Sequence, residues 1–516
     1  MLQDWQLGAA AAKARTEASI PPALRISTAS LPSRVTDLCD GHAALTPLDR
    51  EIIQHDATDL RDRLASRLYT AVQVAQAYIK SASLAHQATN CLTDFFPEEA
   101  LQRAAWLDEQ YEISQGPIGP LHGVPISVKD QIDIAGKDSP AGFLSQVGKN
   151  IAVRDAHVIE ILRSAGAVFY CKTTLPQAIM HLETDSYLAC GVYGFKPTAG
   201  ILPLIGFRNH GCILGVDRVP PTQGPMGRSI RDLELYMQVV LAAKPSLRDP
   251  SLFPFSLGND APPKRIRVGW FLDDGVVTPT APIRRGIEAA VSALKGCADI
   301  ELVEFLPIEP EESWDIAASI KSDSFSRVYS VERTYLPAPS GEPVLDLSEW
   351  IVSQASSEPV TLQEYSALML RRLELRNRVA AQWLSAGIDI LVCPAGPSVA
   401  PKLNTARYWN YTSYWNLVNY PAMVIPTGLY VDGKLDGIDQ PRTSFRNEQD
   451  RYNASCFDLE ASEGVGRISI LIPDLILMLY VLVASNKRAV SRSYLAGPGC
   501  VLRGEEARDS AKAGYK

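Results

Sequence analysis

The sequence is poor in histidine, and it lacks the short motifs that bind nucleotides. Only seven of its 516 residues are histidine, none follows His210, and no HExxH or paired-histidine motif occurs. A P-loop and a dinucleotide-binding fingerprint are also missing. His181, Glu183 and Asp185 are spaced to share one strand face as metal ligands, but a solvated polar strand explains them equally well. We therefore expect no metal and no cofactor.

The nine cysteines are few and scattered. Their number is odd and no CxxC pair occurs. A disulfide framework and a zinc ribbon are thereby disfavoured, and a reducing compartment is favoured. We expect a cytoplasmic protein.

The chain has no basic stripe with interleaved aromatic residues, and its net charge is −8. This charge gives no general attraction to nucleic acid or to anionic lipid. We expect no nucleic-acid partner, and the composition leaves a homo-oligomer open.

No apolar run reaches the roughly 20 residues that a membrane span needs. The longest, ISILIPDLILMLYVLVA at 468–484, contains Pro473 and Asp474. We expect a buried strand or helix there, with a membrane anchor as the alternative. The first residues, 1–22, predict an amphipathic helix and not a secretion signal.

Helix and strand patterns alternate along the chain. Thr46 and Pro47 start a helical pattern that continues with breaks to about residue 84. Thr361 and Glu364 form a capping box at the start of a second long helix, which Gly387 is expected to end. Further helices are expected at 97–109, 155–166 and 280–297, and strands at the apolar end of 121–128 and at 167–171, 265–271, 301–306 and 388–394. This alternation predicts an α/β fold.

Lys129 follows the apolar run 124–128, so its backbone is expected to be buried. Loss of water disfavours the charged ammonium and lowers its pKa, and a neutral lysine can act as a general base. Spacing alone favours the alternative, a strand-end lysine whose amine reaches solvent.

Residues 119–130, GPLHGVPISVKD, resemble the lysine motif of the amidase-signature hydrolases. Other segments resemble the family's fungal acetamidase-like members in the same order: 5–25, 83–108, 155–177, 193–198, 224–229 and 414–428. An ordered set of this kind is far more specific than one motif. The resemblance implies a mixed β-sheet core flanked by helices, with a helical N-terminal lead-in, forming a single domain over 1–460.

The same resemblance implies a catalytic triad of a nucleophilic serine, a bridging serine and a lysine, for which Lys129 is the counterpart. The lysine deprotonates the bridging serine, which activates the nucleophile, and backbone amides stabilise the oxyanion. Both serines belong to a Gly/Ser-rich stretch that should lie between Ser186 and Gly194, where only seven residues stand. No GSSGG-like or GGS-like sequence occurs anywhere, so on the order of 40 residues are expected to be missing, the length of a strand–helix unit.

Ser186, Ser229 and Cys190 are candidate substitutes, but no spacing argument supports them and a structural role is expected for each. Trp409, Tyr411, Tyr414 and Trp415 crowd one region, where core packing is expected and an acyl-group pocket is the alternative.

A second departure begins at about residue 461, where a divergent C-terminal tail, 461–516, replaces the glycine-proline strand of the family. Two local breaks in a well-matched sequence favour a shifted reading frame or a misplaced splice, which sequencing of the transcript would test. We expect an amidase-family hydrolase of small carboxylic acid amides that is impaired or inactive as this chain stands. The alternative is a catalytically dead relative that binds a ligand or a protein partner.

Overall fold

The computed structural model describes residues 3–27, 38, 41–179, 191–208, 219–257, 265–330, 341–354, 360–437, 442–464 and 467–473, with backbone only for 321–330. The helices are α1 Asp4–Ala18, α3 Pro47–Gln54, α4 Ala57–Ala65, α5 Ala71–Thr89, α6 Pro97–Ser114, α7 His157–Ser164, α8 Ile230–Ala242, α9 Ala281–Lys295, α10 Pro310–Ser330, α11 Asp346–Ser353, α12 Leu362–Ala386, α13 Asn410–Leu417, α14 Gly433–Asp436, α15 Glu448–Cys456 and α16 Leu459–Ser462. The strands are β1 Leu92–Phe95, β2 Pro125–Lys129, β3 Val168–Thr173, β4 Tyr193–Lys196, β5 Met226–Gly227, β6 Ile266–Trp270, β7 Ile300–Glu304, β8 Ile390–Pro394, β9 Ala422–Tyr430 and β10 Arg467–Pro473.

The strands form two sheets. A three-stranded sheet has the order β1-β3-β2, in which β2 and β3 are parallel and β1 and β3 are antiparallel. A seven-stranded sheet has the order β5-β4-β9-β10-β8-β6-β7 and is mixed, because β6 is parallel to both β7 and β8 while the other pairs are antiparallel. This arrangement confirms the predicted α/β fold with a mixed sheet.

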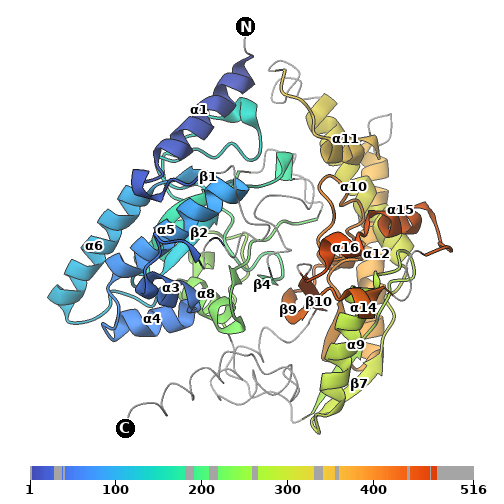
Figure 1. Ribbon diagram of the computed structural model, residues 1–516. Helices are drawn as coiled ribbons and strands as arrows, with labels where there is room; N and C mark the ends of the chain where they lie inside the picture. The colour runs from blue at the N-terminus through green and yellow to red at the C-terminus, as the bar shows by residue number, and fades with distance from the viewer. Residues whose placement is uncertain are drawn as a thin grey trace.

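Helices cover both sheets. α5 and α6 pack on the three-stranded sheet, and α9 packs on the seven-stranded sheet. Figure 1 shows the N-terminal elements, from α1 to α8, on one side of the molecule and the elements from α9 to α12 on the other. β4, β9 and β10 lie between them. Two of the apolar cores follow the same division, one built from residues 20–241 and one from residues 271–471.

Local signals predicted most of these elements. The helix expected from Thr46 appears as α3, α4 and α5, because Asp56 and Thr70 each cap a new helix start by accepting a backbone N–H. Thr361 and Glu364 form the predicted capping box of α12, and Gly387 ends that helix with a φ of 59°. The N-terminal helix is confirmed as α1, although only Thr16 on it is buried.

The apolar segment at 468–484 begins as a strand. β10 occupies the centre of the seven-stranded sheet between β8 and β9, and Ile468, Ile470, Leu471 and Ile472 are buried. The expectation of a buried strand is therefore confirmed for 468–473, and residues 474–484 lie outside the described part. The first residues of the tail predicted from 461 thus belong to the fold.

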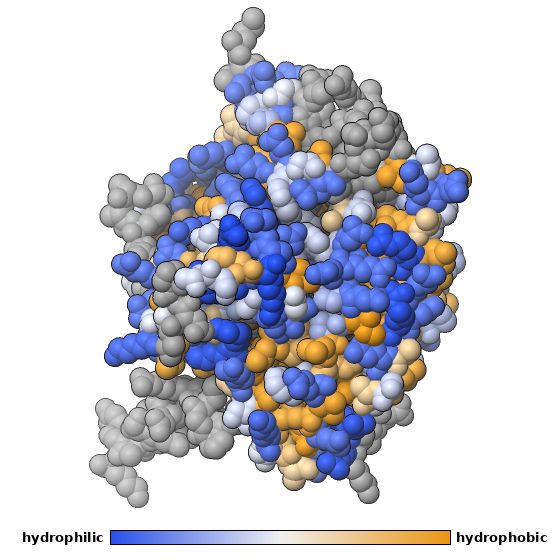
Figure 2. Space-filling view, turned by 90° about the vertical axis from the view of Figure 1, so that its right-hand side faces the viewer, coloured by the Kyte–Doolittle hydropathy of each residue, from blue (hydrophilic) through white to orange (hydrophobic). Residues whose placement is uncertain are grey.

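None of the helices in the described ranges is long and apolar enough to cross a bilayer. Figure 2 shows the side of the molecule that carries α9 and α12, where a largely hydrophilic surface gives way to an apolar area towards its lower part. α12 itself exposes Leu362, Leu370, Leu373 and Leu384.

Candidate functional site

Lys129 is the last residue of β2, where it pairs with Thr173 of β3. Its neighbours Val128 and Asp130 are buried, whereas Lys129 itself is exposed, as the alternative of a strand-end lysine that reaches solvent predicted. Desolvation by the surrounding protein nevertheless lowers the pKa of Lys129 below its ordinary value, and the nearby carboxylate of Asp130 opposes this only in part. The amine is therefore reachable by solvent yet surrounded by enough protein to be desolvated, which suits a general base.

The described residues do not place beside it the relay that such a base needs. In the described part of the chain, Lys129 Nζ makes no hydrogen bond to a serine or to any other hydroxyl. Ser229 caps α8, since its Oγ accepts a hydrogen bond from the backbone N–H of Asp232 at 3.3 Å, and its expected structural role is confirmed. Ser186, Cys190 and the trio His181, Glu183 and Asp185 lie outside the described residues.

A lysine and a serine do meet, but at positions that the sequence did not single out. Lys172 on β3 donates hydrogen bonds to Ser139 Oγ at 2.8 Å and to the backbone oxygen of Asp138 at 2.6 Å. Burial lowers the pKa of Lys172, but Lys172 and Ser139 are both completely inaccessible to solvent. No substrate could reach this pair, so we regard it as structural.

A second desolvated lysine escaped the sequence analysis. Burial lowers the pKa of Lys196, at the end of β4, to about 8. Its Nζ lies 3.3 Å from the backbone oxygen of Pro197, and the YGFKP motif that contains it gave no hint of burial.

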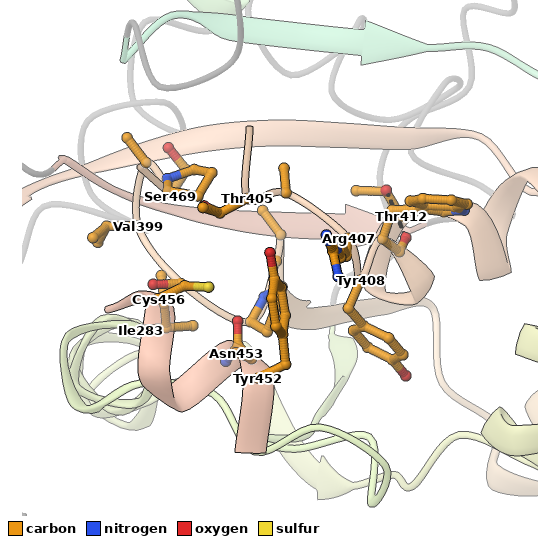
Figure 3. Close-up of a pocket in the computed structure, with 18 of the residues that line it drawn as sticks. Ile283, Val399, Thr405, Arg407, Tyr408, Thr412, Tyr452, Asn453, Cys456 and Ser469 are labelled. Atoms are coloured by element: carbon orange, nitrogen blue, oxygen red, sulfur yellow. Dashed lines mark hydrogen bonds between the residues drawn. The ribbon is translucent and has the colours of Figure 1, made fainter. Parts of the chain in front are cut away.

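A cavity of about 160 Å³ opens in the C-terminal half of the molecule. Its wall combines residues 395–401, which follow β8, with the segment 405–409 that leads into α13, and with parts of α15 and β10. Figure 3 shows side chains from these elements converging on one hollow, with Tyr452 and Arg407 on one side and Val399 on the other. Lys129 is not among the described residues that line this cavity, so the predicted base and the pocket are separate features.

The four aromatic residues at 409–415 are all packed in apolar cores. Tyr411, Tyr414 and Trp415 are buried in the core of this half. Trp409 is buried in a smaller cluster with Phe143, Ala178 and Ile351, and it also lines the cavity. Core packing is thus confirmed for all four residues, and the acyl-group pocket stays a prediction.

Asp450 anchors α15, one wall of the cavity. Burial alone would raise its pKa, but hydrogen bonds from Arg442 and from the backbone N–H groups of Arg446 and Thr278 lower the pKa overall. A carboxylate with a lowered pKa in the folded state stabilises the fold fully above its unfolded pKa of about 3.9, and this contribution disappears as the pH falls through the folded-state pKa.

Asp450→Asn should therefore lower the free energy of unfolding at pH 7 by about 2–3 kcal/mol, because the fully buried carboxylate loses its charge-assisted bonds. Urea unfolding at pH 7 and pH 3 measures this, and the difference from the parent should shrink at pH 3. Glu448→Gln, an exposed change on the same helix, should stay within about 0.5 kcal/mol. Equal losses at both pH values would contradict the assignment.

The fold itself is that of the amidase-signature enzymes. The structure matches fatty acid amide hydrolase with a TM-score of 0.82 over 96% of this chain and 95% of that chain, at 24% sequence identity. In sequence, the chain is 35% identical to a putative amidase of Schizosaccharomyces pombe, over 89% of this chain and 94% of the relative. It is 28% identical to an acetamidase of Emericella nidulans, over 90% and 94% of the two chains. The family model described as amidase matches residues 73–189 and 188–431. The chain therefore belongs to the amidase family, whose members hydrolyse amides.

Two details of these matches bear on the predicted absence of the Gly/Ser-rich stretch. The family match is broken into two segments that meet at residues 188 and 189, inside the interval from Ser186 to Gly194. The alignment with the S. pombe relative runs over 512 positions but takes in only 89% of the 516 residues of this chain. On the order of 50 aligned positions in total thus have no counterpart here, summed over all gaps of the alignment.

Proposed function

We propose that this chain is an amidase-lineage protein that takes small carboxylic acid amides, and that its hydrolytic activity is impaired because the Gly/Ser-rich segment is missing. The single observation that carries the proposal is the break in the family match at residues 188 and 189, where that segment should stand. The acetamidase name of a relative supports a small substrate.

The chemistry follows from what Lys129 can and cannot do alone. A desolvated amine is able to accept a proton, but amide cleavage by this route needs a hydroxyl nucleophile and donors for the oxyanion. Among the described residues no serine is bonded to Lys129 Nζ, so under this proposal Lys129 has no group to activate. A bound amide would therefore stay intact.

A fluorophosphonate probe, which labels activated serines, tests this proposal. We expect no stoichiometric labelling of the purified chain, while the S. pombe relative treated in parallel should be labelled. Mass spectrometry of the intact protein gives the result. Stoichiometric labelling that is lost when one serine is replaced by alanine would overturn the proposed impairment.

A second function, that of a ligand-binding relative without turnover, is favoured by the cavity, whose lining keeps polar groups in place without Lys129.

For location, we propose the cytoplasm, because Cys91, Cys171, Cys297, Cys393 and Cys456 are free thiols in the structure. Cell fractionation would check this location.

A further inference from the structure

The cavity in the C-terminal half is lined by basic and not by acidic side chains, although the protein is acidic overall. Its described lining contains Arg407 and Arg467 but no aspartate or glutamate, in a chain whose net charge is −8. An unbalanced positive charge in a sheltered cavity favours an anionic ligand.

Within the described ranges, Arg407 has no acidic partner for its charge. It is half-buried, and its guanidinium lies 4.6 Å from the ring centroid of Tyr452 and 5.6 Å from that of Trp350. Among the described residues it forms no ion pair and no hydrogen bond. The two rings hold the planar group in one orientation, which prepares it to meet a carboxylate through two parallel N–H bonds.

Two donor atoms in the wall are also buried without an acceptor, namely Nε of Arg407 and Nδ2 of Asn453. Folded proteins leave few such atoms unpaired, because an unmet buried donor is destabilising. Figure 3 shows Arg407 and Asn453 on either side of Tyr452, so both belong to the same part of the cavity.

The rest of the lining is apolar and sets the size of the ligand. Alanine, valine, proline and isoleucine side chains form much of the wall. An apolar cavity of about 150 Å³ is known to accept benzene, and this cavity measures about 160 Å³. A body of about one aromatic ring fits the space.

We propose that this cavity binds a small monocarboxylate with an apolar body the size of a benzene ring, with its carboxylate paired to the guanidinium of Arg407. The inference goes beyond the proposed function, since the ligand is an acid of the kind that amide hydrolysis releases and its binding needs no serine. A failure of hydrolysis therefore leaves the inference standing, and a failure of binding leaves the proposed function standing.

Calorimetric titration with benzoate and with neutral benzamide tests the inference. The parent protein should bind benzoate at least about tenfold more tightly than benzamide, as charge-assisted hydrogen bonds allow. Arg407→Gln should lower the affinity for benzoate to that for benzamide. The affinity of Arg407→Lys for benzoate should lie between those of the parent and Arg407→Gln. Arg451→Gln, which removes an exposed arginine of α15 outside the lining, should change neither affinity.

A second variant tests whether this cavity is the binding site, and it leaves the charge of Arg407 in place. Gly396 lines the cavity, and a Cβ added there would come no nearer than 3.8 Å to any other group, so Gly396→Leu should fold and fill the space. Gly396→Leu should weaken the binding of benzoate by at least about tenfold. Equal affinities for benzoate and benzamide, no binding of either, or an unchanged preference in folded Arg407→Gln would overturn the inference.

Discussion

Amide hydrolysis by this chain should be on the order of a million-fold slower than hydrolysis by a chimera that carries the segment proposed to be missing. In that chimera, residues 187–193 are replaced by the longer matching segment of the S. pombe relative. The expected gain is large because the segment should supply a nucleophile, a bridging hydroxyl and oxyanion donors together, and groups that act as a unit lose nearly everything when one is absent. Release of ammonia from acetamide and from benzamide measures both rates.

Lys129 should matter only once the relay is restored. Lys129→Met should abolish turnover by the chimera and leave the parent chain unchanged, whereas Lys149→Met, an exposed change, should affect neither. The rate of the chimera should rise with pH and level off below the ordinary lysine pKa of about 10.4, because burial lowers the pKa of Lys129 and the neutral amine is the active form. Acetamide turnover by the parent at the speed of the chimera would contradict the proposed impairment.

The fold could be predicted because its signals are local. Capping residues such as Thr46 and Thr361 mark helix starts within three residues of sequence, and buried strands such as β3 and β8 are short apolar runs. The position of β10 in the sheet was harder to predict from the sequence. Its apolar pattern indicated burial, but its pairing with both β8 and β9 depends on residues more than 35 positions away.

The site was predictable only where one segment carries it. Lys129 sits in a contiguous motif, so the family resemblance could single it out from the sequence, and its catalytic role stays a prediction. The cavity wall draws on residues from Ile283 to Ser469, and nothing near Arg407 in sequence indicates that two aromatic rings from other elements will flank it. Lys172 was missed for the same reason, since Asp138 and Ser139 precede it by 34 and 33 residues.

Lys172→Met should lower the free energy of unfolding by about 3 kcal/mol, because two fully or nearly inaccessible acceptors would lose their donor while the side-chain volume is nearly kept. Urea unfolding of parent and variant at pH 7 measures this loss, and Lys149→Met serves again as the exposed control, with a change within about 0.5 kcal/mol. A loss below about 1 kcal/mol would contradict the role assigned to the two hydrogen bonds.

The pH dependence of that loss distinguishes a desolvated lysine from an ordinary one. Burial lowers the pKa of Lys172 in the folded state, so between that pKa and the ordinary value of about 10.4 the unfolded chain binds more protons. The stability of the parent relative to Lys172→Met should therefore rise as the pH increases through this interval. Ser139→Ala, combined with Lys172→Met in a double-mutant cycle, should show a coupling of at least about 0.5 kcal/mol, since the two side chains share one hydrogen bond. Additive losses would mean that Lys172 acts through Asp138 alone, and a stability difference that does not change with pH would show that its amine is not desolvated.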